Sequence, residues 1–290
     1  MINGMDVSIF QEYLYGVVKP ENLRPIDWAQ VFADPRRFEF VYVKAAHGYA
    51  VPGIHPDAYP VESWFRNLNA IRAQGKPAGP YHYWYWKLNG VKVDPAEQAK
   101  AFYTAVKNDI GDLPPCGDIE DTSAVIDCVP LSWTTAEANA KLINARQVLA
   151  SLAVYLEEMS NLFKRQAVPY SGPWWINQVA MQVRYYYPQD LDWMKQYGWF
   201  SADYTGPLDD VPEWKEIIHQ HASTAIPAIP GITVTGGTRV DLIRWLGTDE
   251  EFRLWRGLPP VVPPVKHSWA IEITNWAREQ DPPYAGPGPE

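Results

Sequence analysis

The sequence has no run of 18 or more apolar residues, so it offers no candidate for a membrane-spanning helix. Its first six residues, Met-Ile-Asn-Gly-Met-Asp, lack both the basic start and the apolar segment of a signal peptide. We therefore expect a soluble protein that is made in the cytoplasm without a signal peptide and does not insert into a membrane. Any target outside the cytoplasm would be reached by another route.

Clustered basic residues are also missing. The formal net charge is −9, and the Lys and Arg residues form no block along the chain. Proteins bind the phosphates of nucleic acids mainly through clustered Lys and Arg. We therefore expect no nucleic-acid partner.

Metal-binding patterns are equally scarce. The six histidines include no His-x-x-x-His pair, and His219 with His221 supplies too few ligands for a metal site. The two cysteines, Cys116 and Cys128, have no Cys-x-x-Cys spacing. They either close a short disulfide loop or remain buried free thiols. We expect no metal and no cofactor.

Aromatic residues are abundant by contrast, with 14 Trp and 17 Tyr, several of them clustered at positions 81–86, 174–175 and 185–187. Aromatic faces can stack on the apolar faces of sugar rings, while Tyr and Trp keep a polar group for hydrogen bonding. The alternative for each ring is ordinary packing in the core or at its rim.

The order of the expected elements indicates the fold class. The 290 residues, 47% of them hydrophobic, are enough for one large α/β domain. We expect a single irregular β/α (TIM-like) barrel over residues 1–250 and a Pro-rich tail or linker over residues 251–290 that could join a larger assembly. The expected strands are 4–10, 38–46, 81–86, the segment with Asp118 and Glu120, 168–175, 214–222 and 240–243, and the expected helices are 26–34, 64–74, 96–108 and 135–164.

Paired acids mark a candidate site. Asp118 and Glu120 lie two residues apart behind a proline pair, and side chains at that spacing share one face of a strand. Asp6 lies inside the first expected strand, where a carboxylate is unusual. Glycosidic-bond hydrolysis needs one protonated and one charged carboxyl group side by side. The alternatives are a solvated acidic turn for the pair and an ion pair for Asp6.

Five short motifs together resemble the landmarks of glycoside hydrolase family 25, the Chalaropsis-type lysozymes, from about Gly4 to Arg244. They are Asp6-Val7-Ser8 followed by Gln11, Phe40 to Ala45 with Gly48, Gly79 to Tyr83, Leu113-Pro114-Pro115 before Asp118-Ile119-Glu120, and Val240-Asp241-Leu242.

The resemblance implies an irregular β/α barrel that cuts the β-1,4 bond between N-acetylmuramic acid and N-acetylglucosamine in the glycan strands of peptidoglycan, as phage endolysins and bacterial autolysins do. It assigns Glu120 as the general acid, Asp118 as the acid two residues before it, and Asp6 and Asp241 as carboxylates on the first and last strands. A substrate 2-acetamido group could attack C1 while Asp118 stabilises the intermediate, and we favour this substrate-assisted route.

The sequence departs from the family pattern in two places. His47 stands where the second-strand motif often has an acid, and His219-Gln220-His221 stands where the family often has Trp-Gln-Tyr. Both changes concern substrate contacts rather than the reaction. The candidate substrate-binding residues are Tyr81, His82, Tyr83, Tyr170, Trp174, Gln220 and His47, with Trp175 as an alternative to Trp174.

Two other functions fit parts of this pattern. One is a glycan-binding or structural module of a phage tail or injection assembly that has the barrel without turnover. The other is a hydrolase on the same scaffold that acts on a different amino-sugar polymer. Because all four acids of the family are present, the sequence favours a hydrolase over a binding module.

Overall fold

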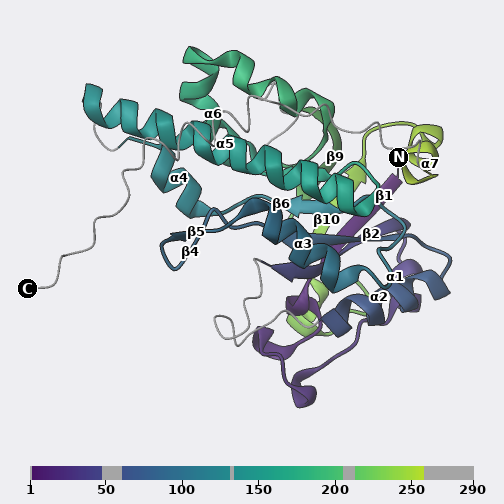
Figure 1. The fold of residues 1–290 in the computed structure, drawn as a ribbon. Coiled ribbons are helices and arrows are strands. Elements are labelled where there is room, and N and C mark those ends of the chain that lie inside the picture. Colours follow the sequence, from purple (N-terminus) through teal and green to yellow (C-terminus); the bar gives the residue numbers. More distant parts are fainter. Residues whose placement is uncertain (1, 48–60, 131–133, 205–212, 258–290) are drawn as a thin grey trace, which may run out of the picture.

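Eight strands close into a barrel in the computed structural model, which describes residues 2–47, 61–130, 134–204 and 213–257 (Figure 1). The order around the barrel is β1-β10-β9-β8-β7-β6-β3-β2. The predicted α/β barrel is therefore confirmed. The strands are β1 (Ile2–Val7), β2 (Phe38–His47), β3 (Ala78–Tyr83), β6 (Cys116–Asp118), β7 (Val168–Ser171), β8 (Gly198–Ala202), β9 (Lys215–Ala222) and β10 (Asp241–Trp245), and β4 (Lys87–Leu88) and β5 (Val91–Lys92) form a separate hairpin.

The barrel is irregular at its closure. Neighbouring strands from β1 through β2, β3, β6, β7 and β8 to β9 run parallel, whereas β10 runs antiparallel to both β9 and β1. The last strand therefore begins at the end of the barrel where the parallel strands finish. This reversal decides which residues of β10 can reach the carboxyl ends of the other strands.

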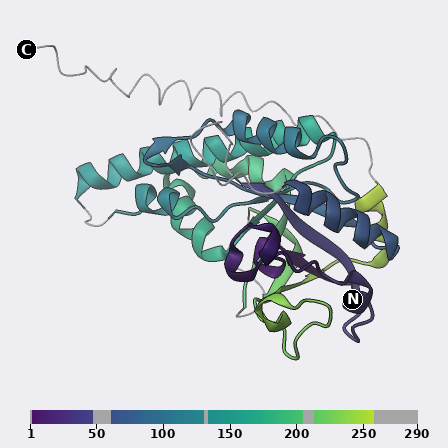
Figure 2. The same ribbon diagram turned by 90° about the horizontal axis from the view of Figure 1, so that it is seen from below.

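Helices cover the outside of the barrel, with the long helix α5 running across one side between α3 and α6 (Figures 1 and 2). Helix α5 begins where the Thr134 side chain accepts a hydrogen bond from the Glu137 N–H, and it ends at Lys164, which has a left-handed backbone conformation. The helices are α1 (Trp28–Phe32), α2 (Val61–Ala73), α3 (Pro95–Val106), α4 (Thr122–Cys128), α5 (Thr135–Phe163), α6 (Pro173–Tyr186) and α7 (Asp249–Gly257).

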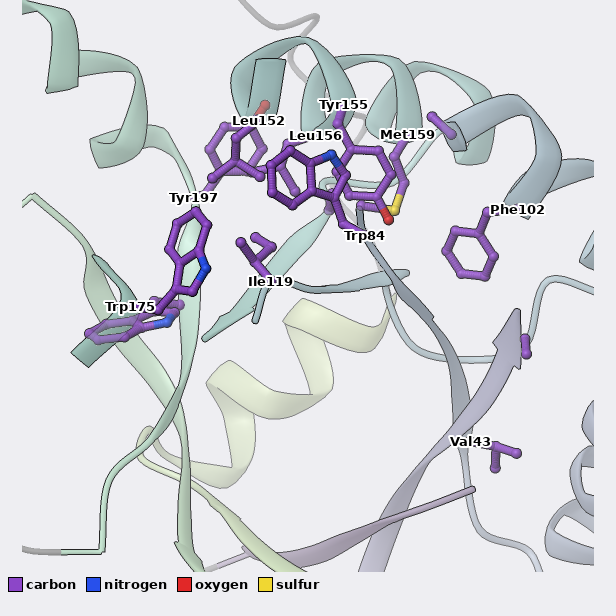
Figure 3. Close-up of a cluster of buried hydrophobic side chains, with 14 of the residues drawn as sticks. Val43, Trp84, Phe102, Ile119, Leu152, Tyr155, Leu156, Met159, Trp175 and Tyr197 are labelled. Atoms are coloured by element: carbon purple, nitrogen blue, oxygen red, sulfur yellow. The ribbon is translucent and has the colours of Figure 1, made fainter. Parts of the chain in front are cut away.

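Alternation along the strands separates two hydrophobic cores. One core fills the barrel and includes Phe40, Tyr42, Phe200 and Ile243. The larger one lies between the strands and the helices and includes the side chains that α5 presents to the barrel. Figure 3 shows part of this outer core, where Trp84, Phe102, Ile119, Tyr155 and Trp175 gather beneath α5.

Helix α7 closes one end of the barrel. Its Phe252 ring packs against Phe40 on β2 with ring centroids 5.2 Å apart, and against Trp245 on β10 at 5.5 Å. The Trp255 ring also packs against Trp245, at 4.9 Å. These contacts lie at the start of β1, far from the carboxyl ends of the parallel strands, so the opposite end of the barrel is left for a site (Figure 1).

Several predicted elements differ from the structure. The expected strand 168–175 ends at Ser171, because Pro173 opens helix α6, where proline fits the first turn. The expected strand 81–86 is β3, which starts at Ala78 and ends at Tyr83. Strand β8 and helices α4, α6 and α7 were not expected. The loop 49–61, apart from Val61 at the start of α2, lies outside the described residues. Of the predicted tail 251–290, residues 251–257 belong to helix α7, and residues 258–290 lie outside the described residues.

The two cysteines have separate environments. Cys116 faces the barrel interior, Cys128 ends α4 in the outer core, and both are buried free thiols. Of the two alternatives that the sequence leaves open, the structure has the free thiols. Within the described part of the chain, no helix is both long and apolar enough to cross a bilayer.

Candidate active site

Four carboxyl groups line one pocket at the carboxyl ends of the parallel strands. Asp6 on β1 pairs in register with Asp241 on β10. Because β10 runs antiparallel, its first residue lies beside the end of β1. Asp118 ends β6, and Glu120 follows two residues later. The pocket has a volume of about 190 Å³ and is lined by Asp6, Ser8, Phe10, Tyr42, Lys44, Tyr81, Cys116, Asp118, Glu120, Tyr170, Phe200 and Asp241.

The paired acids Asp118 and Glu120 do not share a strand. Strand β6 stops at Asp118, and Glu120 lies on the connection to α4. The prediction of two carboxylates on one strand face is therefore wrong in its local geometry. Both side chains nevertheless line the pocket.

Burial and mutual repulsion separate the protonation behaviour of the acids. Burial, together with the nearby Asp118 and Asp241 carboxylates, raises the pKa of Glu120 to about 8. Burial also raises the pKa of Asp118 to about 6, against the attraction of the Lys44 ammonium. At neutral pH the site therefore holds a protonated Glu120 beside an ionised Asp118. Glycosidic-bond cleavage requires one protonated and one ionised carboxyl group.

Asp6 and Asp241 form a hydrogen-bonded pair of carboxyl groups. Burial and the other three acids raise the pKa of Asp6 well above its usual range, so Asp6 carries the shared proton and donates it. The Gln220 Nε2 also donates to Asp241 Oδ1 at 2.7 Å and to the Tyr204 hydroxyl at 2.9 Å. Asp241 is thus held in a fixed orientation as an acceptor.

Lys44 supplies positive charge to the pocket. Its Nζ lies 5.0 Å from the Tyr83 ring centroid and 5.6 Å from that of Tyr81, within range of cation–π attraction. Burial lowers the pKa of Lys44, while Asp118, Glu120 and Asp6 oppose that change. The ammonium therefore favours the ionised form of Asp118.

One oxygen of Asp118 has no hydrogen-bond partner among the described residues. Asp118 is 8% exposed, and this oxygen, Oδ1, is buried. A buried carboxylate oxygen without a donor costs free energy, which agrees with the raised pKa of Asp118.

The predicted substrate-binding residues divide into two groups. Tyr81 and Tyr170 line the pocket, and the Tyr83 ring lies beneath Lys44. Gln220 contacts the pocket through Asp241. Sequence reasoning missed Ser8, Phe10, Tyr42, Lys44, Cys116 and Phe200. Strand alternation from Asp6, Tyr81 and Asp118 could have indicated Tyr42 and Lys44, since both occupy inward positions of β2.

The other three predicted residues lie elsewhere. His82 is fully buried on the outer face of β3, where its Nδ1 is 2.7 Å from the Tyr155 hydroxyl, so it does not face the pocket. Trp174 lies in the first turn of α6, is 43% exposed and is not part of the pocket lining. His47 ends β2 and contacts the edge of the Tyr85 ring, with centroids 6.4 Å apart. Trp175, the alternative to Trp174, is buried in the outer core.

Metal ligands are not grouped in the described ranges: no set of three or more His, Cys, Asp or Glu side chains there could hold a metal ion.

The repulsion among the acids predicts a stability effect for Asp241→Asn. Burial raises the Asp241 pKa from 3.8 to about 6 in the folded protein, so its contribution to stability is present below pH 4 and is lost as the pH rises through 6. The substituted asparagine cannot ionise but can still accept from Gln220 and can donate to Asp6. We expect it to stabilise the protein by about 1–3 kcal/mol at pH 8, that is, to raise Tm by several degrees. Thermal unfolding at pH 8 and pH 4 measures this, and an equal Tm change at both values would contradict it.

Comparison with known proteins agrees with this geometry. The model of the family "Glycosyl hydrolases family 25" matches residues 21–231, a range that contains Asp118 and Glu120. Asp6 and Asp241 lie outside that range and reach the same pocket through the β1–β10 pairing. No curated protein sequence matches the chain.

Solved structures of similar fold include three glycan hydrolases. A bacterial lysozyme from Streptomyces coelicolor has a TM-score of 0.58 and 16% identity, and the match covers 88% of this chain and 96% of that one. A muramidase from Acremonium alcalophilum has a TM-score of 0.56 and 18% identity, covering 88% and 99%. A family 25 glycosyl hydrolase from Bacillus anthracis has a TM-score of 0.54 and 17% identity, covering 87% and 92%. At these identities the likeness concerns the fold.

Proposed function

Because the chain belongs to glycosyl hydrolase family 25 and is therefore a glycoside hydrolase, we propose that it cleaves the β-1,4 bond between N-acetylmuramic acid and N-acetylglucosamine in peptidoglycan. Solved proteins of similar fold are described as lysozyme and muramidase, which supports this choice of substrate. Peptidoglycan lies outside the cytoplasm, so the protein would act after release or delivery to the cell wall.

The observation that carries the proposal is the contrast between Glu120 and Asp118. The two carboxyl groups line the same pocket, and their pKa values are about 8 and about 6. A glycosidic oxygen is a poor leaving group until it is protonated. Glu120, which keeps its proton at neutral pH, is the group that can donate it.

Asp118 would act on the other side of the bond. Its carboxylate lines the pocket and can accept the N–H of a 2-acetamido group, which orients the acetamido carbonyl oxygen toward C1. As Glu120 gives its proton to the leaving oxygen, the carbonyl oxygen bonds to C1 and the C1–O bond breaks. The ionised Asp118 then stabilises the positive oxazolinium ion. Water, deprotonated by Glu120, opens this ion and restores the original configuration at C1.

Digestion of purified cell walls tests the proposal. The expected result is a fall in turbidity together with new reducing ends, which borohydride reduction and acid hydrolysis identify as muramic acid. Reducing ends on glucosamine would indicate a different bond, and release from chitin but not from walls would indicate another amino-sugar polymer. If the protein binds walls and releases no sugar, it is a binding module and the proposed reaction is wrong.

The pH dependence of kcat/KM is expected to be bell-shaped. Activity needs an ionised Asp118 and a protonated Glu120, so it should rise near pH 6 and fall near pH 8. The Asp241 charge raises the pKa of Glu120, so Asp241→Asn should move the alkaline limb to lower pH. Rates on a soluble glycan fragment from pH 4 to pH 10 measure both limbs. An alkaline limb that stays in place in Asp241→Asn would show that this carboxylate does not tune Glu120.

A further inference from the structure

Glu120 lies on the short connection that follows strand β6. Strand β6 ends at Asp118, helix α4 begins at Thr122, and residues 119–121 link them. The position of a strand residue follows from its ladder of backbone hydrogen bonds, but Glu120 is past the end of that ladder. Its main chain is therefore fixed through the residues on either side of it, Ile119 and Asp121.

Ile119 anchors the connection on the N-terminal side of Glu120. Its N–H donates to the Tyr170 carbonyl at 2.8 Å, and its carbonyl accepts from the Ser171 Oγ at 2.7 Å. The Ile119 side chain is fully buried in the outer core, beside Trp84 and Trp175 (Figure 3). Both polar atoms of this residue are thus bonded to β7, and its side chain is packed.

Asp121 anchors the connection on the C-terminal side. It is 6% exposed, and its carboxyl group connects two separate elements. Oδ2 accepts from the Trp86 N–H and from the Ser123 Oγ, both at 2.7 Å, and Oδ1 accepts from the Ser123 N–H at 2.9 Å. The segment after β3 and the first turn of α4 are therefore tied to the residue that follows Glu120.

Trp175 on α6 provides a third anchor for the connection. Its Nε1–H donates to the Asp121 carbonyl oxygen at 2.9 Å. The indole is fully buried, and its ring meets that of Trp84 edge-on, with centroids 6.2 Å apart and planes at 83°. The ring cannot shift without disturbing the outer core, so the position of the Nε1 donor is fixed.

We infer that Asp121 and Trp175 are positioning residues for Glu120, since they hold the main chain on which the proton donor is carried. The inference rests on the proposed function of Glu120. Neither residue lines the pocket, and the carboxylates that raise the Glu120 pKa are Asp118 and Asp241. Asp121 and Trp175 therefore affect the reaction through the position of Glu120. A misplacement of about 1 Å can reduce a rate about 100-fold.

The test compares Trp175→Phe with Trp64→Phe. Both indoles are fully buried, and each donates one hydrogen bond to an aspartate carbonyl, Trp175 to Asp121 at 2.9 Å and Trp64 to Asp109 at 3.0 Å. The two variants therefore lose the same kind of contact, one beside Glu120 and one remote from it. We expect similar decreases in Tm for both, a 5- to 50-fold lower kcat for Trp175→Phe only, and KM within twofold of wild type in both.

A second pair of variants tests the inference if a tryptophan variant does not fold. Asp121→Asn and Asp190→Asn change carboxylates of similar burial, because Asp190 is 7% exposed and pairs with Arg146 at 2.7 Å. We expect Asp121→Asn to lower kcat, Asp190→Asn to retain it, and Asp121→Ala to lose more than Asp121→Asn, since the asparagine side chain keeps one oxygen acceptor. The alkaline limb of the pH profile should stay in place in Asp121→Asn.

Each outcome bears on the inference. Equal kcat values for wild type and Trp175→Phe, or equal losses in Trp175→Phe and Trp64→Phe, would overturn it, as would a loss confined to KM. A moved alkaline limb in Asp121→Asn would show an electrostatic role instead. If the wild type releases no sugar, the proposed function fails first, and that failure is seen before any variant is compared.

Discussion

Glu120→Gln is expected to lower kcat on cell walls by about 10²- to 10⁴-fold and to leave the fold intact. Glutamine has the shape of the protonated acid but gives up no proton to the glycosidic oxygen. Burial and repulsion already oppose ionisation of Glu120, so a neutral replacement should not destabilise the pocket. The variant should still bind wall fragments with near wild-type affinity, which equilibrium binding to a muramyl tetrasaccharide would measure.

The matched control is Glu216→Gln on β9. Glu216 is half-buried and accepts from His219 on the outer side of the barrel wall, remote from the pocket lining. This substitution makes the same chemical change and should leave kcat unchanged. A Glu120→Gln enzyme with more than a tenth of wild-type kcat would remove Glu120 from the role of proton donor, whatever the control does.

Asp118→Asn is expected to lower kcat by about 10²- to 10³-fold. The variant loses the negative charge beside the oxazolinium ion, although the amide oxygen can still accept a hydrogen bond. KM should change little, because the charge matters most when the positive intermediate forms. Asp190→Asn, which removes a carboxylate charge of similar burial far from the pocket, should behave as wild type in the same assay.

Asp118→Ala with added azide separates the two possible roles of this carboxylate. If the acetamido group is the nucleophile, azide should not restore the rate, because the nucleophile is part of the substrate. If Asp118 attacks C1 itself, azide should rescue the alanine variant and yield the glycosyl azide of inverted configuration. That product, identified by NMR, would overturn the substrate-assisted route.

The barrel could be predicted because its strands follow strong local patterns. Phe38–His47 is rich in β-branched and aromatic residues, and Pro95 and Gly75 mark a helix start and a helix end as expected. The reversal of β10 could not be predicted, since strand direction depends on pairing between residues far apart in sequence. Strand β8 was missed because Gly198–Ala202 is short and follows an aromatic segment that also suits a helix.

The sequence predicted the four carboxyl groups of the pocket, but only some of the other residues that line it. Asp6, Asp118, Glu120 and Asp241 all line the pocket. The first three were predicted from their spacing and strand context, and Asp241 only from the family resemblance. His82 was misplaced because a run of aromatic residues was treated as one surface, although Tyr81 and Tyr83 alternate with it along β3. Ser8 and Phe10 were missed although alternation from Asp6 along the predicted strand 4–10 places them on the same face; in the structure β1 ends at Val7, and both side chains still line the pocket.

The pairing of Asp6 with Asp241 also constrains when the acid cluster can exist. These residues lie near opposite ends of the described chain, and their contact closes the barrel after every other barrel strand has been made. Contacts so distant in sequence form late in folding, because the chain between them must first be ordered. A partly synthesised polypeptide would therefore carry Glu120 without the Asp241 charge that helps to keep it protonated. Hydrolytic competence would appear only once the last strand has joined the first.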